Sequence, residues 1–435
     1  MVEPKTNETA AFVISAKMAK ALADRWRSRI MMELSVRPLS PSQFVEEAGG
    51  ELPHIARCFR QLAEWDYIEI AETKRGGHRR GGVEHVYRSI HRAHFDTSVW
   101  EGLPRVHRDA FSGSILESYL ARICEAIEAR TFDDELDRHL SWDEIPLDRI
   151  AWVQLVTRLD ETLHWLPELA VEAAERMART GEEPIPTTVG LSAFRAATQA
   201  RTQRAARQSG ESVRPPDLTP FVISAKTAKA VANKWRSRIL MELRVRPLSP
   251  TQFVKEIGGG RRHISRCFSQ LAEWDYIEVI ETRSGGPRRG GKEKFYRLKQ
   301  RAHFDTRTWE KLPRFLRDEF SVSILESYFA RVTEAIEAGT FDAEVDRHLS
   351  WDGVALDRIA WEELIARLDK ILYWLPTLEE EAAERMAETD EEPIPTIVGL
   401  AAFRSPKSSE IASQTPGPHR TDTGLPLNGR SMPSG

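Results

Sequence analysis

Residues 40–89 read SPSQFVEEAGGELPHIARCFRQLAEWDYIEIAETKRGGHRRGGVEHVYRS, and residues 249–298 read SPTQFVKEIGGGRRHISRCFSQLAEWDYIEVIETRSGGPRRGGKEKFYRL. The match extends without a gap over residues 12–195 and 221–404, with about 70% of the aligned positions identical. A repeat of this length has the size of one or two domains, whereas solenoid units have about 20 to 50 residues. The chain is therefore a tandem duplication, and its two copies must share one fold.

The front part of each copy carries the periodic signals of three helices. Apolar side chains recur every fourth position over residues 15–35, which predicts an amphipathic helix. A short second helix is expected between Ser40 as N-cap, followed by Pro41, and the Gly49–Gly50 pair. A third helix is predicted over residues 52–65. Its inward stripe consists of Ile55, Phe59 and Leu62.

After the third helix the hydrophobic period changes from that of a helix to that of a strand. The alternating runs YIEIAET (67–73) and VEHVYRS (83–89) flank the segment RGGHRRGG (75–82). This pattern predicts a two-stranded ribbon with a basic, glycine-rich tip. Three helices followed by such a ribbon is the element order of a winged helix-turn-helix domain.

Residues 12–92 and 221–301 resemble the ArsR-type winged helix repressors. The shared features are a helix with a central arginine, a short helix opened by serine, a recognition helix ending in a leucine-rich segment, an aromatic turn and a wing closing on tyrosine. They are carried by Arg25 to Arg29, Leu62, Tyr67 and Tyr87 in copy one and by Lys234 to Arg238, Leu271, Tyr276 and Tyr296 in copy two. The resemblance implies recognition helices in the major groove of double-stranded DNA.

The back part of each copy resembles the helical extension of a less studied subgroup of such regulators. In copy one, long helices are expected at about residues 104–130 and 147–179, closed by the strand-like PIPTTVGLSAF at residues 184–194. Their apolar faces are Ile115, Tyr119, Ile123 and Ile127, and Trp152, Leu155, Val156, Leu159 and Leu163. Because such stripes are usually core, we expect the two extensions to pack as in a dimer, with a small-molecule effector as a candidate ligand.

These signals predict an α+β fold, mainly helical with small β parts. We expect two winged helix-turn-helix domains (12–92 and 221–301), two acidic helical extensions with short strands (93–195 and 302–404), a linker (196–220), and disordered ends (1–11 and 405–435). As a flexible coil the linker would span on the order of 25 to 30 Å. This length permits pairing of the two copies within one chain.

The formal net charge of −4 conceals a segregation of charge within each copy. The front parts of copies one and two carry about +4 and +12, whereas their back parts carry about −10 and −12. A basic domain fits a polyanionic partner, although a solvated surface rich in lysine and arginine explains the same charge without one. Since copy two is the more basic, we expect the two copies to bind DNA unequally.

The outward side chains of the third helix are the predicted DNA contacts. They are His54, Arg57 and Arg60 in copy one and Arg261, Arg262, His263, Arg266 and Ser269 in copy two. Arg57 and Arg266 are the leading base readers, because arginine can make two hydrogen bonds to guanine. Contact with phosphate alone is equally open, since at least half of protein–DNA hydrogen bonds go to the DNA backbone.

Each predicted wing tip places two arginines between glycine pairs. The four side chains are Arg79, Arg80, Arg288 and Arg289. Glycine allows a sharp bend and a close approach to DNA, so insertion into a narrow minor groove is the functional interpretation. A solvated turn is the plainer alternative.

The sequence offers little support for a metal, a cofactor or an enzyme. Metal sensors of the ArsR type carry a cysteine cluster at the recognition helix, whereas this chain has the single Cys58 there, which we interpret as a core residue. His94 with Asp96, repeated as His303 with Asp305, supplies too few ligands to define a site. No nucleophile–base pair, phosphate-binding loop or catalytic carboxylate pair stands out.

The remaining signals indicate a cytoplasmic protein without a membrane partner. No apolar run approaches the roughly 20 residues that span a bilayer, and the start MVEPKTNETAA is unlike a signal peptide. The main hypothesis is a sequence-specific transcriptional regulator, a repressor, whose two copies form a pseudo-dimer. The alternative is a winged-helix scaffold for protein interactions, whose acidic extensions recruit a partner and whose DNA binding is weak or absent.

Overall fold

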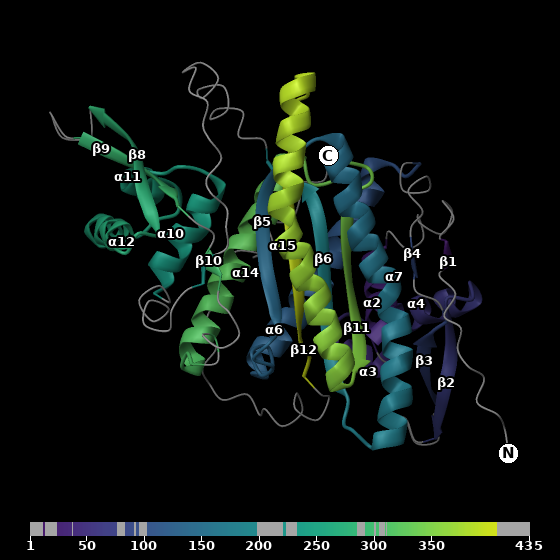
Figure 1. Cartoon of the computed structure of the whole chain (residues 1–435). Helices are drawn as coiled ribbons and strands as arrows, with labels where there is room; N and C mark the ends of the chain where they lie inside the picture. Colours follow the sequence, from purple (N-terminus) through teal and green to yellow (C-terminus); the bar gives the residue numbers. More distant parts are fainter. Residues whose placement is uncertain are drawn as a thin grey trace. The chain divides into compact units, whose positions relative to one another are not determined.

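The computed structural model describes residues 12–13, 24–36, 38–75, 83–90, 93–94, 102–197, 221–222, 233–284, 292–299, 302–303, 309 and 311–406. It is a mixed α and β structure whose larger sheets are antiparallel, which agrees with the predicted α+β class (Figure 1). The chain divides into two compact units, residues 1–209 with 334–405 and residues 210–333 with 406–435. We call residues 12–92 and 221–301 the heads and residues 93–195 and 302–404 the extensions.

The head of copy one forms three helices and an antiparallel ribbon in the predicted order. Its elements are α2 (Arg25–Val36), α3 (Pro41–Ala48), α4 (Leu52–Glu64), β2 (Ile68–Arg75) and β3 (Val83–Ser89), with the short strands β1 (Phe12–Val13) and β4 (Ala93–His94) paired in parallel. The first helix is confirmed from Arg25 onward, and its expected start at residues 15–23 lies outside the described residues.

The head of copy two repeats this arrangement within the second unit. Its elements are α10 (Lys234–Val245), α11 (Pro250–Glu256), α12 (Arg261–Glu273), β8 (Ile277–Ser284) and β9 (Lys292–Leu298), with the parallel pair β7 (Phe221–Val222) and β10 (Ala302–His303). The expected ribbon is thus present in both copies. In each head the segment before the second helix also pairs with the ribbon, Leu39 with Tyr87 and Leu248 with Tyr296.

Local chemistry explains the start of α3 and the turn that separates it from α4. The predicted cap is confirmed: the Ser40 hydroxyl accepts from the Gln43 amide at 3.2 Å, and the Gln43 side chain accepts from the Ser40 amide at 2.9 Å. Gly50 follows with a φ of +100°, and a Cβ there would lie 3.0 Å from the Trp26 ring. Only glycine satisfies both the conformation and the space, so α4 is set at a defined angle to α3.

Each extension consists of a long helix, a strand, a second long helix and a closing strand. The elements of copy one are α6 (Arg105–Glu128), β5 (His139–Leu147), α7 (Arg149–Thr180) and β6 (Ile185–Arg195), and those of copy two are α14 (Arg314–Glu337), β11 (His348–Leu356), α15 (Arg358–Thr389) and β12 (Ile394–Arg404). Both expected helices of copy one are confirmed. The strand β5 was not predicted, and at nine and eleven residues the strands of copy one are longer than the expected short strands.

One four-stranded antiparallel sheet in the first unit combines strands of both copies. Its order is β11-β6-β12-β5, so strands of copies one and two alternate. At the centre of the sheet Leu191 pairs with Leu400, and Leu400 is the residue of copy two that corresponds to Leu191. The pairing is therefore related by a pseudo-twofold axis through these two leucines.

The sheet is covered on both faces. Helices α7 and α15 lie side by side across one face (Figure 1). Between them and the sheet, Trp152 and Trp361 are fully buried among leucines of both copies. On the other face the α6 residue Tyr119 contacts β6 so closely that a Cβ at Gly190 would lie 2.4 Å from its ring. Alternate residues of a strand face opposite sides of the sheet. Val189 and Leu191 therefore belong to the core under α7 and α15, whereas Gly190 lies on the opposite face and leaves room for the Tyr119 ring.

Polar contacts join the two extensions in reciprocal pairs. Arg176 binds Asp357 at the start of α15, at 2.5 and 3.0 Å, and Arg385 binds Asp148 at the start of α7 at the same distances. Both aspartates also cap their helices by accepting from a backbone amide. Asp148 and Asp357 have pKa values below their usual range, chiefly because of these arginine hydrogen bonds.

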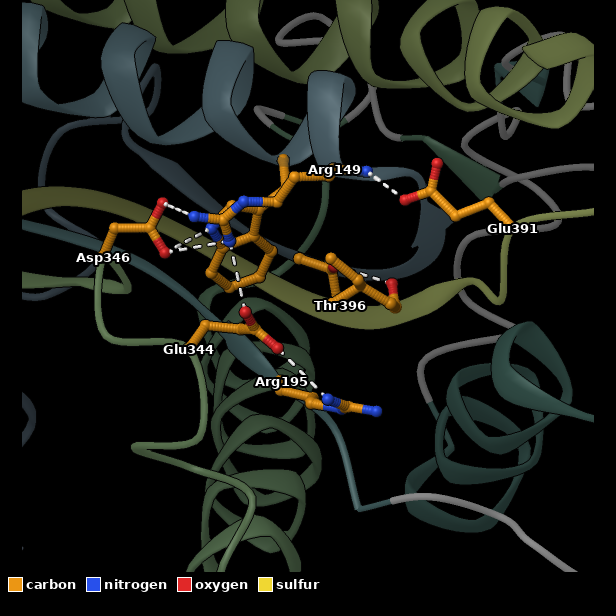
Figure 2. A network of polar contacts seen from close by, with 8 residues as sticks. Arg149, Arg195, Glu344, Asp346, Glu391 and Thr396 are labelled. Carbon is orange, nitrogen blue, oxygen red and sulfur yellow. Dashed lines mark hydrogen bonds and ion pairs between the residues drawn. The ribbon is translucent and has the colours of Figure 1, made fainter. Parts of the chain in front are cut away.

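A second network lies where β6 ends and α7 begins (Figure 2). Arg149 binds Asp346 at 2.7 Å and Glu344 at 3.2 Å, and Glu344 also binds Arg195 at 3.1 Å. The Arg149 amide donates to Glu391 of copy two at 3.1 Å. Acidic side chains of one copy thus meet arginines of the other.

Candidate nucleic-acid interface

The third helix of the copy-one head separates a buried face from a charged one. Ile55, Cys58, Phe59 and Leu62 are buried, as predicted for the three apolar residues of this stripe and for Cys58. The predicted contact residues His54, Arg57 and Arg60 are all exposed on the rest of the helix surface. The structure therefore presents these three side chains together to solvent.

The third helix of the copy-two head has the same division. Ile264, Cys267, Phe268 and Leu271 face inward. The predicted contact residues Arg261, Arg262, His263, Arg266 and Ser269 are all exposed. The first two lie in the first turn of α12, directly after its N-cap Gly260.

The guanidinium groups on these helices have few internal partners. Among the described residues no carboxylate forms an ion pair with Arg57, Arg262 or Arg266. Arg60 donates only weakly to the Ala56 carbonyl of its own helix, at 3.4 Å. Arg261 reaches the Thr251 hydroxyl at 3.5 Å. At such lengths these bonds hold the side chains loosely, so most donors of the five arginines face solvent.

The predicted wing arginines Arg79, Arg80, Arg288 and Arg289 lie outside the described residues, which stop at residue 75 or 284 on one side of each tip and resume at residue 83 or 292. The strands leading to the tips are described. Lys292 and Lys294 of β9 are exposed, and Arg297 is bound to Glu278 at 2.6 Å. Copy two therefore has exposed lysines on its ribbon in addition to the exposed arginines of α12.

Cys58 and Cys267 are buried in their helices, and burial raises the pKa of both thiols. Each sulfur lies close to a histidine one turn earlier, Cys58 Sγ at 3.8 Å from His54 Nε2 and Cys267 Sγ at 3.7 Å from His263 Nε2. The sequence analysis missed this contact, although the spacing of four residues could have suggested it. Each histidine therefore has a contact to its own helix in addition to its exposure.

Two further histidine positions are duplicated, the pair considered above as metal ligands, His94 and His303, and the pair His139 and His348. The side chains of His94 and His303, and residues Asp96 and Asp305, lie outside what the structure describes. His139 is buried and lies 2.9 Å from Asp369 and 2.8 Å from Ser141, and its equivalent His348 repeats both contacts. Over the described ranges no group of three or more histidine, cysteine or acidic residues could hold a metal.

A buried ion pair that the sequence analysis did not predict joins each head to its extension. Arg122 of α6 donates to Glu33 of α2, and Arg331 of α14 donates to Glu242 of α10 at 2.8 Å. All four side chains are at least nine-tenths buried. The recurrence in both copies of an acidic residue and an arginine 89 positions apart was the only available signal.

None of the helices in the described part of the chain is long and apolar enough to cross a lipid bilayer.

A scan against protein-family models matches no family, and a search of curated proteins finds no match to the chain. The function proposed for the chain therefore depends on the residues of the heads and extensions themselves.

Proposed function

We propose that the chain is a sequence-specific DNA-binding transcriptional regulator of the ArsR type, a repressor, in which each head is a winged helix-turn-helix domain. In this proposal α3 and α4, and α11 and α12, are the helix-turn-helix pairs, and the ribbons are the wings. The order of elements, the glycine turn between the helices and the antiparallel ribbon support it. The third helix of each head would enter the major groove.

One observation carries the proposal. Arg57 and Arg266 occupy the same outward position of the third helix in both copies, exposed and without a carboxylate partner among the described residues. Exposed arginines on a helix that packs its other face into a core are suited to guanine edges or to phosphates. An exposed guanidinium could equally serve a protein partner, and the DNA measurement below decides between them.

The extensions fit the role of a permanent dimerisation region. Two-headed regulators place two recognition helices on one duplex, and here the alternating sheet and the reciprocal arginine–aspartate pairs join the copies. The same region is the candidate place for an effector. In this proposal the linker replaces the association of two separate chains.

The test is binding of the full chain to duplex DNA. Fluorescence anisotropy on a site selected from a random pool, repeated over a salt series, measures affinity and phosphate neutralisation together. In Arg57→Ala/Arg266→Ala, each lost bidentate contact is expected to weaken specific binding by about 1 to 3 kcal/mol and to relax base preference at matching positions.

The matched control is Arg179→Ala/Lys370→Ala, which removes two exposed charges from helices α7 and α15 of the extensions. It should leave the preference unchanged. If the full chain binds no duplex even at low salt, the interaction scaffold becomes the better interpretation. If binding survives with unchanged specificity in the head variant, Arg57 and Arg266 are not base readers.

A further inference from the structure

The two heads have the same internal scaffold. Three ring contacts run from the first helix to the ribbon in each: Trp26–Phe44, Phe44–Phe59 and Phe59–Tyr87 have centroid distances of 6.3, 5.9 and 5.3 Å, and their equivalents in copy two have 6.4, 5.9 and 5.2 Å. The glycine turn before the third helix is also repeated, with a Cβ at Gly259 meeting Trp235 at 3.0 Å. Differences between the heads must therefore arise from their surfaces.

The surface differences cluster around the third helix and the ribbon. From the second helix to the end of the ribbon, seven positions of described exposure, all at or near the surface, differ in charge between the copies: Glu46 to Lys255, Glu51 to Gly260, Leu52 to Arg261, Pro53 to Arg262, Arg60 to Ser269, Val83 to Lys292 and His85 to Lys294. At these positions copy one has two carboxylates and one arginine, whereas copy two has two arginines and three lysines. Copy two thus gains positive charge on its second and third helices and on its ribbon.

The largest chemical change lies in the first turn of the third helix. In copy one α4 begins with Leu52, which is 44% exposed, and Pro53, after the N-cap Glu51. In copy two α12 begins with two exposed arginines after the uncharged Gly260. The first residues of a recognition helix are those that meet base edges. Leucine and proline offer apolar contact only, whereas arginine can select guanine or neutralise phosphate.

We infer that the two heads read different half-sites, and that copy two supplies most of the affinity through Arg261 and Arg262. The inference deepens the DNA-binding function proposed above and depends on it. The duplex that fits the chain is an imperfect palindrome. Its copy-two half carries guanine opposite the start of α12, and its copy-one half lacks that requirement.

The full chain allows a reciprocal test, because each surface triplet already occurs on the same scaffold. One variant gives copy two the residues of copy one, Gly260→Glu/Arg261→Leu/Arg262→Pro. The other gives copy one the residues of copy two, Glu51→Gly/Leu52→Arg/Pro53→Arg. The proline introduced into copy two falls in the first turn of α12, where α4 already accommodates one. Circular dichroism verifies folding, and Arg261→Gln/Arg262→Gln replaces the first variant if it fails to fold.

Selection of duplexes from a random pool and anisotropy over a salt series are the two readouts. The inference expects unequal half-sites for the native chain. It also expects a loss of about 10-fold or more in affinity for the copy-two variant. The copy-one variant should gain affinity and select a more symmetric site. A perfectly palindromic native site, or similar effects of the two exchanges, would overturn the inference while leaving DNA binding intact. Failure of the native chain to bind any duplex at low salt would instead overturn the proposed function.

Discussion

The heads and the extensions use their ion pairs differently. In the heads, pairs such as Arg88 with Glu69 join neighbouring strands of one copy and leave both side chains nearly half exposed. In the extensions, pairs such as Arg385 with Asp148 join the two copies, and the carboxylate is almost completely buried. Exposed pairs contribute little stability, whereas losing one partner of a buried pair is costly. The extensions therefore hold the copies together, and the heads keep their basic side chains at the surface.

This difference decides which experiments on the two heads are meaningful. Within the first unit both neighbours of β6 are strands of copy two, β11 and β12. Residues 1–200 alone would lack both neighbours and would expose the apolar face that Trp361 and its surroundings cover. A comparison of isolated halves would thus measure sheet disruption as well as DNA binding. Exchange of surface residues within the full chain avoids this problem.

The largest expected effect concerns the core that the copies share. Trp361 of α15 is fully buried in a cluster that contains residues of both copies. Trp361→Ala should lower the free energy of unfolding by about 3 to 5 kcal/mol, because a large cavity replaces the indole. Denaturant unfolding followed by circular dichroism measures the change.

Ile359→Ala is the matched control for Trp361→Ala, since Ile359 lies two residues earlier on the same helix and is 53% exposed. Its effect should stay within about 0.5 kcal/mol. Equal losses in the two variants would show that α15 does not pack on a shared core, and the contrast between heads and extensions would fail.

Much of the heads could be predicted because their signals are local. The Ser40–Pro41 start, the glycine pair at residues 49–50 and the stripe of Ile55, Phe59 and Leu62 each act over a few residues, and the structure contains all of them. The outward placement of Arg57 followed from the same helical period. The wing tips remain a prediction, since they lie outside the described residues.

The sheet could not be predicted in the same way. Strand β5 lies in an acidic stretch of the sequence. The first three residues on its face towards α15 are the polar His139, Ser141 and Asp143, so the sequence does not show the alternating apolar pattern of a buried strand. Its partner β12 is about 250 residues away in sequence, and a one-dimensional period contains no information on such pairing. For the same reason, the sequence does not distinguish Arg176 and Arg385, which bind carboxylates of the other copy, from ordinary surface charges.

The next largest effect concerns the connection between a head and its extension. Glu33→Ala leaves the Arg122 guanidinium buried without its main partner, although Glu125 still accepts from it at 2.8 Å. Loss of one member of a buried pair should lower the free energy of unfolding by about 3 kcal/mol. Thermal or denaturant unfolding of the full chain measures this loss.

The double variant Glu33→Met/Arg122→Met separates burial of an unpaired charge from loss of packing. Replacing both members with apolar residues of similar length should recover most of the stability. If the double variant is as unstable as Glu33→Ala, the charge pair is not the source of the effect. In that case α2 and α6 would be joined chiefly by their shape.

The third and smallest effect concerns the arginine–aspartate pairs that join the two copies, whose contribution to stability should depend on pH. Arginine hydrogen bonds hold the pKa values of Asp148 and Asp357 below the usual range, so the folded state releases these protons more readily than the unfolded state. Their contribution is complete above about pH 4 and is lost as the pH falls through the lowered folded values. Arg385→Gln, which removes one of the two pairs, should therefore cost about 2 kcal/mol at pH 7. The difference from the native chain should shrink towards pH 3, because the native chain loses the same contribution there.

Arg179→Gln, which alters an exposed arginine of α7, should behave as the native chain at both pH values. An equally large difference at pH 3 and pH 7 would mean that the arginines act through packing of their side chains, and the extensions would then be joined by shape more than by charge.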